Sequence, residues 1–357
     1  MIYPVAKLLL KRFLGLALLL AFSAGLAQNS LTLVQALSQA YSRGPSLQSA
    51  QATLQNARLQ LSALSADPST LVAARTQAEQ NAKLAEVNLE ATRLSVMQSV
   101  VNAYVGLYEA QQNVGLFQAQ VALNQRNLDV AKARQAAGNA TALDVARAQT
   151  TLDSSRQSLT NAQAQIPILS AQLATLLGVS DLGNFTTVAP PAAPVLQADL
   201  QPLSRDLFAR LPSVLQAQQA VELSQLNVKL ADNDYTPAVQ LNSAKTSLEN
   251  NQRTLQTAQQ NAQTSLTNTY QAAQNAYRNI ALAQANVTNA QRVVEQSQAA
   301  LRAGTISALQ LQTDQVSLRG TEYSLVQAQG SYWKALAAFS VAAGQDFTGL
   351  VRAASLP

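Results

Sequence analysis

The chain has 357 residues, of which 48% are hydrophobic, 12% charged and 5% aromatic, and it contains no histidine and no cysteine. The absence of both residues excludes disulfides, zinc sites built on Cys or His, and nucleophiles activated by a His base, so we expect no enzyme activity, no cofactor and no metal. The net charge of +5 is spread along the chain without Lys or Arg runs, and we expect no nucleic-acid partner.

Residues 1–27 have the pattern of a secretory signal peptide. Basic residues precede the apolar run 13–22, and the small residues Gly25 and Ala27 stand where a cleavage site is expected. An apolar run of this length is too short to span a bilayer as a helix. We therefore expect export with cleavage after Ala27; a retained membrane anchor is the alternative.

Long helical patterns dominate the rest of the sequence. No proline interrupts the segment from about Thr70 to Ala136, which is rich in the good helix formers Ala, Leu and Gln. Apolar residues recur here every seven positions, which is typical of a coiled-coil seam. They are Val87, Leu94, Val101 and Tyr108. Such a helix would be about 100 Å long, more than a compact domain can use.

The sequence contains two copies of one unit, because residues 99–178 align to 265–344 without a gap. In each copy a glycine is expected to end the long helix in a left-handed conformation, and a Ser or Thr to cap the next helix. We therefore predict a helical hairpin with a tight tip in each copy. The predicted tip residues are Gly138, Asn139, Ala140 and Thr141 in the first copy, and Gly304, Thr305, Ile306 and Ser307 in the second.

These patterns define the expected domain organisation. Four prolines between the copies disfavour a continuous helix and favour an extended connector; they are Pro190, Pro191, Pro194 and Pro202. The expected divisions are a signal peptide (1–27), a first helical-hairpin repeat (28–178), a Pro-rich linker (179–204), a second repeat (205–345) and a C-terminal tail (346–357).

Several segments resemble TolC-like outer-membrane efflux proteins. The resemblance rests on residues 31–61, on the glycine tips, on "LLG" at 176–178 and "AAG" at 342–344, and on "DYTP" at 234–237. It implies an exported homotrimer at the outer membrane and in the periplasm, whose helices form a tube for efflux or export. It also implies that the tips form the entrance of the pore and dock a periplasmic adaptor, which joins an inner-membrane transporter.

The chain departs from this family where the family inserts a membrane β-hairpin in each copy. The first copy has only the Asp67–Pro68 break at that place, and residues 232–243 leave room for one short strand at most. We therefore expect a mainly all-α fold of long antiparallel coiled-coil hairpins from two tandem repeats, with little or no β-barrel. A barrel-less periplasmic structural or adaptor protein is the alternative function.

A second departure concerns the pore constriction, where the family often places Asp residues after the second tip. Gln310 and Thr313 stand at those positions, whereas Asp144 matches the family's Asp after the first tip. The resemblance thus makes Asp144, Gln310 and Thr313 the candidate constriction. Capping of the following helix is the alternative role for Asp144 and Gln310.

Overall fold

The computed structural model of the chain describes residues 30–179, 185–197 and 199–354. The predicted signal peptide lies outside these residues. The helices are α2 (Leu33–Arg43), α3 (Pro45–Ala66), α4 (Val72–Ala136), α5 (Ala142–Leu177), α6 (Leu200–Arg210), α7 (Pro212–Ala231), α8 (Ala238–Arg302), α9 (Ala308–Ala343) and α10 (Leu350–Ala354). Two short parallel strands, β1 (Ser30–Leu31) and β2 (Thr186–Thr187), pair with each other.

The internal repeat is visible in the helix lengths. Helices α4 and α8 each have 65 residues, and the returning helices α5 and α9 each have 36. At the rise of an α-helix, α4 and α8 are each about 98 Å long. The prediction of a mainly all-α fold of two tandem helical hairpins is therefore confirmed.

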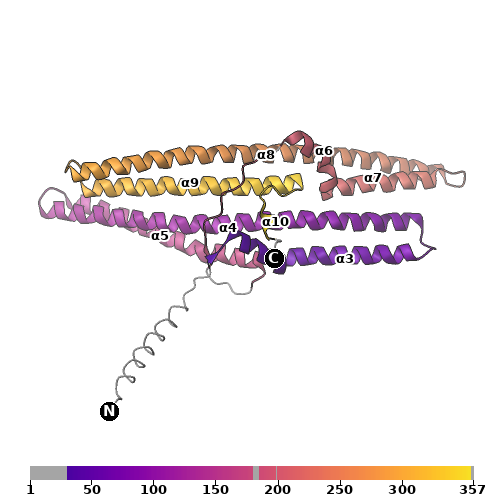
Figure 1. Ribbon diagram of the computed structural model, residues 1–357, viewed down its shortest axis with the longest axis horizontal. Coiled ribbons are helices and arrows are strands. Elements are labelled where there is room, and N and C mark those ends of the chain that lie inside the picture. Colours follow the sequence, from indigo (N-terminus) through magenta and orange to yellow (C-terminus); the bar gives the residue numbers. More distant parts are fainter. Residues whose placement is uncertain (1–29, 180–184, 198, 355–357) are drawn as a thin grey trace, which may run out of the picture.

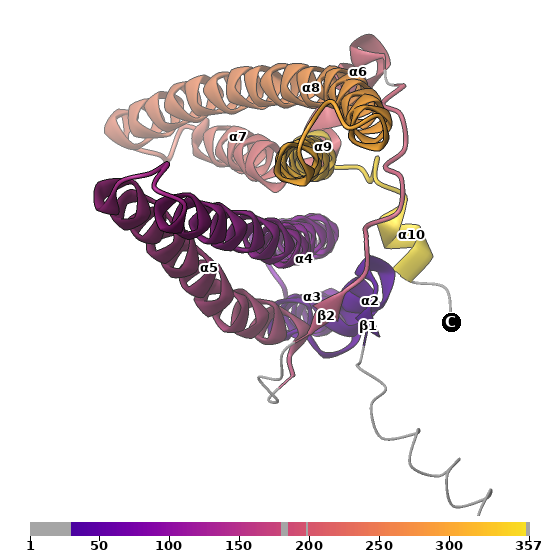
Figure 2. The same cartoon turned by 90° about the vertical axis from the view of Figure 1, so that its left-hand side faces the viewer.

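The long helices form a layer that is one helix thick (Figure 1). Helix α4 contacts α3 and α5 on one side and α7 and α9 on the other, and α8 contacts α7 and α9 in turn. This order leaves α8 at one edge of the layer and α3 with α5 at the opposite edge. Helix α6 lies against α7, α8 and α9, whereas the small elements β1, β2, α2 and α10 lie together on one side of the layer (Figure 2).

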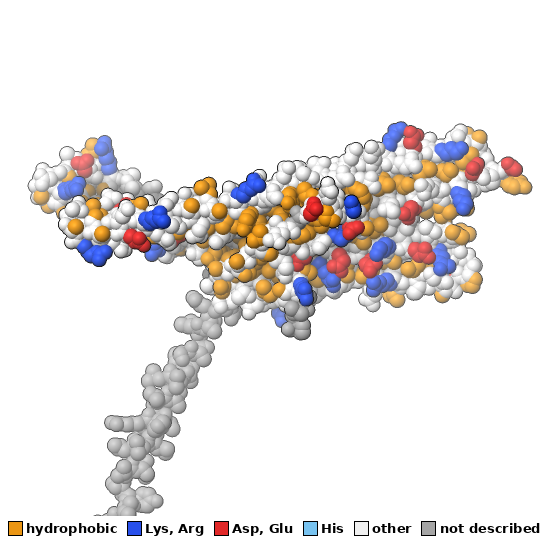
Figure 3. All heavy atoms as spheres, turned by 45° about the horizontal axis from the view of Figure 1, so that its top comes forward, with side chains coloured by type: hydrophobic (Ala, Val, Ile, Leu, Met, Phe, Trp, Pro, Cys, Tyr) orange, Lys and Arg blue, Asp and Glu red, His pale blue; other side chains and the backbone are white. Residues whose placement is uncertain are grey.

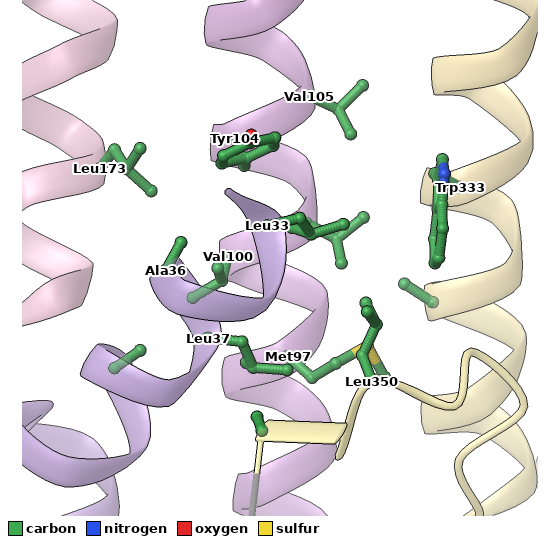
Figure 4. Close-up of a cluster of buried hydrophobic side chains, with 14 of the residues drawn as sticks. Leu33, Ala36, Leu37, Met97, Val100, Tyr104, Val105, Leu173, Trp333 and Leu350 are labelled. Atoms are coloured by element: carbon green, nitrogen blue, oxygen red, sulfur yellow. The ribbon is translucent and has the colours of Figure 1, made fainter. Parts of the chain in front are cut away.

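The main hydrophobic core lies where these small elements cover the middle of the layer. Leu33 and Leu37 of α2 pack against Met97 of α4 and Leu350 of α10, and all four side chains are buried (Figure 4). The fully buried Tyr104 reaches past this cluster, with its hydroxyl 2.7 Å from each of two main-chain carbonyl oxygens, those of Leu31 and Val188. The core thus joins the strands to the centre of α4.

The connection between the repeats is extended over the part that crosses the layer, but it is shorter than predicted. Helix α6 begins at Leu200, so Pro202 lies inside this helix, although residues 179–204 were expected to form an extended linker. Its position in the first helical turn explains this, because the N–H group that proline lacks has no intrahelical partner there. The predicted C-terminal tail likewise contains the short helix α10.

Short turns occupy both positions at which the resembled family inserts a membrane β-hairpin. The chain passes from α3 to α4 across residues 67–71 and from α7 to α8 across residues 232–237. The single short strand allowed for 232–243 is absent from this described segment, because α8 begins at Ala238, directly after Pro237. No helix in the described part of the chain is long and apolar enough to cross a membrane.

Candidate functional site

The two predicted tips lie at the same end of the layer (Figure 1). The first joins α4 to α5 across residues 137–141, and the second joins α8 to α9 across residues 303–307. A hydrogen bond from the Arg126 guanidinium to the Gln312 side chain, 3.3 Å long, connects α4 to α9 above the tips. The repeat therefore presents two equivalent hairpin ends in one direction.

Each tip is closed by a glycine with a left-handed backbone. Gly138 has φ = 78° and Gly304 has φ = 73°, a region that other L-residues rarely adopt. The next N–H group bonds back into the helix in both tips: from Asn139 to the Arg134 carbonyl oxygen at 2.8 Å, and from Thr305 to that of Ala300 at 3.0 Å. These bonds satisfy carbonyl groups that the helix end would otherwise leave without a partner.

The first tip continues into a complete capping box. The N–H of Asp144 donates to Thr141 Oγ1 at 3.2 Å, and the N–H of Thr141 donates to Asp144 Oδ2 at 2.8 Å. These hydrogen bonds from the Thr141 main chain and side chain hold the pKa of the exposed Asp144 carboxyl below its usual value. The capping role considered for Asp144 is therefore present in the structure.

The second tip is capped differently, and it contains a carboxylate that sequence reasoning missed. The N–H of Gln310 donates to Ser307 Oγ at 3.1 Å, but the Gln310 side chain donates to Asp314 Oδ1 at 3.0 Å. Ser297 of α8 donates to the other oxygen of Asp314 at 2.6 Å. Asp314 thus ties α8 to α9, and its i, i+4 spacing from Gln310 was the available signal.

The candidate constriction residues share an exposed setting. Asp144, Gln310 and Thr313 are all exposed in the single chain, and the Thr313 hydroxyl donates to the Leu309 carbonyl oxygen at 3.0 Å. Only Asp144 carries a charge. The three side chains belong to two different tips, and the single chain does not bring them together into one cluster.

The opposite end of the layer exposes apolar side chains at the two short turns. Tyr235 is 97% exposed, Leu71 76% and Val239 75%. Hydrophobic side chains reach this end in the space-filling view and also gather near the middle of the molecule, whereas acidic and basic side chains are spread along its length (Figure 3). Both ends carry polar residues, and the end with the short turns also exposes the large apolar side chains Leu71, Tyr235 and Val239.

Residues 66–179 match the family of outer membrane efflux proteins. No curated protein matches by sequence.

Solved structures share the fold over most of the chain. VceC, an outer membrane protein of Vibrio cholerae, has a TM-score of 0.64 at 18% identity, over 88% of this chain and 96% of its own. The CmeC outer membrane channel of Campylobacter jejuni has a TM-score of 0.66 at 14% identity, over 87% and 85% of the two chains. Residues 66–179 thus match the outer membrane efflux protein family, and the described chain shares the fold of these outer membrane channels.

Proposed function

We propose that three copies of the chain close into a helical tube that acts as a passive conduit for efflux or export. The observation that carries the proposal is the layer one helix thick, with a long helix at each edge. Both edges expose apolar side chains: Ile168 of α5 is 60% exposed and Leu282 of α8 is 64% exposed. Burying them is favourable, and two unlike edges that pair head to tail can close a ring.

The tips are the proposed entrance of this conduit and its docking surface. Two tips per chain in three chains give a ring of six equivalent hairpins. A periplasmic adaptor would bind the tip residues Gly138–Thr141 and Gly304–Ser307 and connect them to an inner-membrane transporter. The energy for transport would come from that partner, so the chain itself needs no catalytic residue.

The proposed constriction consists of Asp144, Gln310 and Thr313 from each copy. Rings of carboxylates favour cations in narrow pores. The lowered pKa of Asp144 keeps this carboxylate ionised at neutral pH, whereas Gln310 and Thr313 add no charge. The charge preference of the entrance would therefore depend on the first tip of each chain.

The end with the short turns is the one we assign to the outer membrane. Its exposed residues include Leu71 and Tyr235, and leucine and tyrosine are suited to the boundary between water and lipid. The second candidate function, a periplasmic structural or adaptor protein, draws on the same turns, because they replace the inserted membrane hairpins of the family that the chain resembles.

Fractionation of the full chain separates these two functions. We expect the protein in outer membranes after a carbonate wash, as a trimer that heat dissociates into single chains. The variant Ile168→Asp should weaken the trimer, because it places a charge in the proposed interface, whereas Tyr235→Asp at the far end should leave the trimer intact. Release of the wild-type protein into the soluble fraction as single chains would contradict the conduit and favour the periplasmic structural protein.

A further inference from the structure

A cavity of about 330 Å³ lies in the middle of the layer, where the connection between the repeats crosses the helices. Its walls come from α4 (Val105 and Tyr108), from α8 (Tyr277 and Ile280), from α9 (Trp333) and from residues 189–195, which we call the strap. The cavity therefore lies between the two repeats and beneath the segment that joins them.

The strap is held across the cavity by two side chains of α9. Trp333 Nε1 donates to the carbonyl oxygen of Pro191 at 3.0 Å. The Tyr332 hydroxyl donates to the carbonyl oxygen of Pro194 at 2.6 Å and accepts from the Leu196 N–H at 3.0 Å. Because proline fixes the backbone and the remaining strap residues are mostly alanines, the strap bridges the helices without filling the space below.

One wall of the cavity lies at a close contact between α4 and α9. Gly330 of α9 is buried against α4, and a Cβ atom at this position would collide with Val105 and with the Glu109 carboxylate. Beside it, Lys334 forms an ion pair with Glu109 at 2.9 Å. The glycine permits the close approach of α4 and α9, and the ion pair joins the two helices beside it, so contacts within the single chain form this wall.

The chemistry of the walls defines what would fit. Aromatic rings and aliphatic groups dominate, and none of the described residues lining the cavity carries a charge. Tyr108 and Gln329 line the cavity, and their hydroxyl and amide groups have no hydrogen-bond partner among the described residues. Apolar walls with a few polar groups are typical of small-molecule sites, whose volumes begin at about 300 Å³.

We infer that this cavity binds a small, uncharged aromatic molecule that carries one or two hydrogen-bonding groups. The rings of Tyr277 and Trp333 contact its flat faces, and Tyr108 and Gln329 bond its polar group. The site is separate from the tips, and it requires only the contacts within one chain. A bound molecule touches both repeats and the strap, so it stabilises the junction between them.

The only tryptophan of the chain, Trp333, provides the assay. We would titrate the full chain with the neutral probe N-phenyl-1-naphthylamine and follow energy transfer from Trp333, at one fixed detergent concentration. Saturable transfer with one probe per chain is expected. An anionic naphthalene sulfonate should bind at least tenfold more weakly, because the walls offer its charge no partner.

Two variants decide whether the probe occupies this cavity. Val326→Phe fills the space and should weaken binding at least tenfold, whereas Val239→Phe makes the same change at an exposed site on α8 and should bind like the wild type. Wild-type affinity in Val326→Phe, or an equal loss in Val239→Phe, would overturn the inference. If Val326→Phe does not fold by circular dichroism, Tyr108→Phe decides: a three- to tenfold loss supports the site, and no change overturns it.

Discussion

The Tyr104 hydroxyl should contribute strongly to the free energy of unfolding, because main-chain carbonyl groups of two separate segments of the chain lie within hydrogen-bond distance of it. The side chain is fully buried, and its oxygen lies 2.7 Å from the carbonyl oxygens of both Leu31 and Val188. The change Tyr104→Phe keeps the ring and removes the donor; the Leu31 carbonyl oxygen still accepts from the Val188 N–H, so the Val188 carbonyl oxygen is the group left without a donor. An unsatisfied buried group costs about 1–3 kcal/mol, so we expect a loss of about 2 kcal/mol in the free energy of unfolding.

Denaturant unfolding of the full chain, followed by circular dichroism, measures this loss. Hydrogen exchange should locate it at the Val188 N–H, which donates to the Leu31 carbonyl oxygen at 3.2 Å. The matched control is Tyr108→Phe, one helical turn away, whose hydroxyl has no hydrogen-bond partner among the described residues. The reasoning is refuted if the two variants lose equal stability, or if Tyr104→Phe loses less than about 0.5 kcal/mol.

The same hydroxyl predicts how stability changes at alkaline pH. Burial raises the pKa of Tyr104 from 10.0 to about 12. Because the pKa of Tyr104 is raised in the folded state, its neutral hydroxyl contributes fully to the free energy of unfolding below pH 10. This contribution is lost as the pH rises toward 12. The loss should be about 2.7 kcal/mol at most, from about 1.36 kcal/mol per pKa unit. Tyr104→Phe should show a correspondingly weaker decline over this pH window.

Three further predictions concern the two ends of the molecule. Gly304→Ala should destabilise the second tip by about 1 kcal/mol, because the φ of Gly304 is 73°. The control Gly320→Ala, inside α9, should stabilise the protein by up to about 1 kcal/mol, since a Cβ atom at this position contacts nothing. Thermal unfolding of the two variants measures the difference. Protection from hydrogen exchange at the α5 N-terminus, relative to the intrinsic exchange rate, should decrease as the pH falls through the lowered pKa of Asp144, and Asp144→Asn should remove this pH dependence. Tyr235→Asp should release the protein from washed outer membranes, whereas Tyr108→Phe should not.

The long helices and their tips could be predicted from local sequence. The seven-residue pattern identified Val87, Leu94 and Val101, which are all buried on α4. The glycine and cap residues located both tips because their conformations depend only on neighbouring residues. Such patterns are informative wherever the conformation of a segment depends only on residues within a few helical turns of it.

The central core and the strap could not be predicted in this way, because their contacts join distant segments. Tyr104 meets Leu31 and Val188 across 73 and 84 positions of sequence. Nothing near Trp333 in the sequence indicates that its indole N–H bonds to Pro191, which is 142 positions away. Pro202 and α10 were misjudged because a first-turn proline and a five-residue helix have weak local signals.

The position of the core also gives a physical reason for the proposed association of three chains. A layer one helix thick buries side chains only along the seams between neighbouring helices, and the largest buried cluster lies where α2 and α10 add a second layer at the middle. Toward the tips the described residues provide no such cover, and residues 132–136 of α4 and 137–139 of the first tip are all exposed. The parts farthest from the core therefore gain most when another copy covers an edge. In the proposed trimer, the ends of the layer would gain the cover that the single chain has only at its centre.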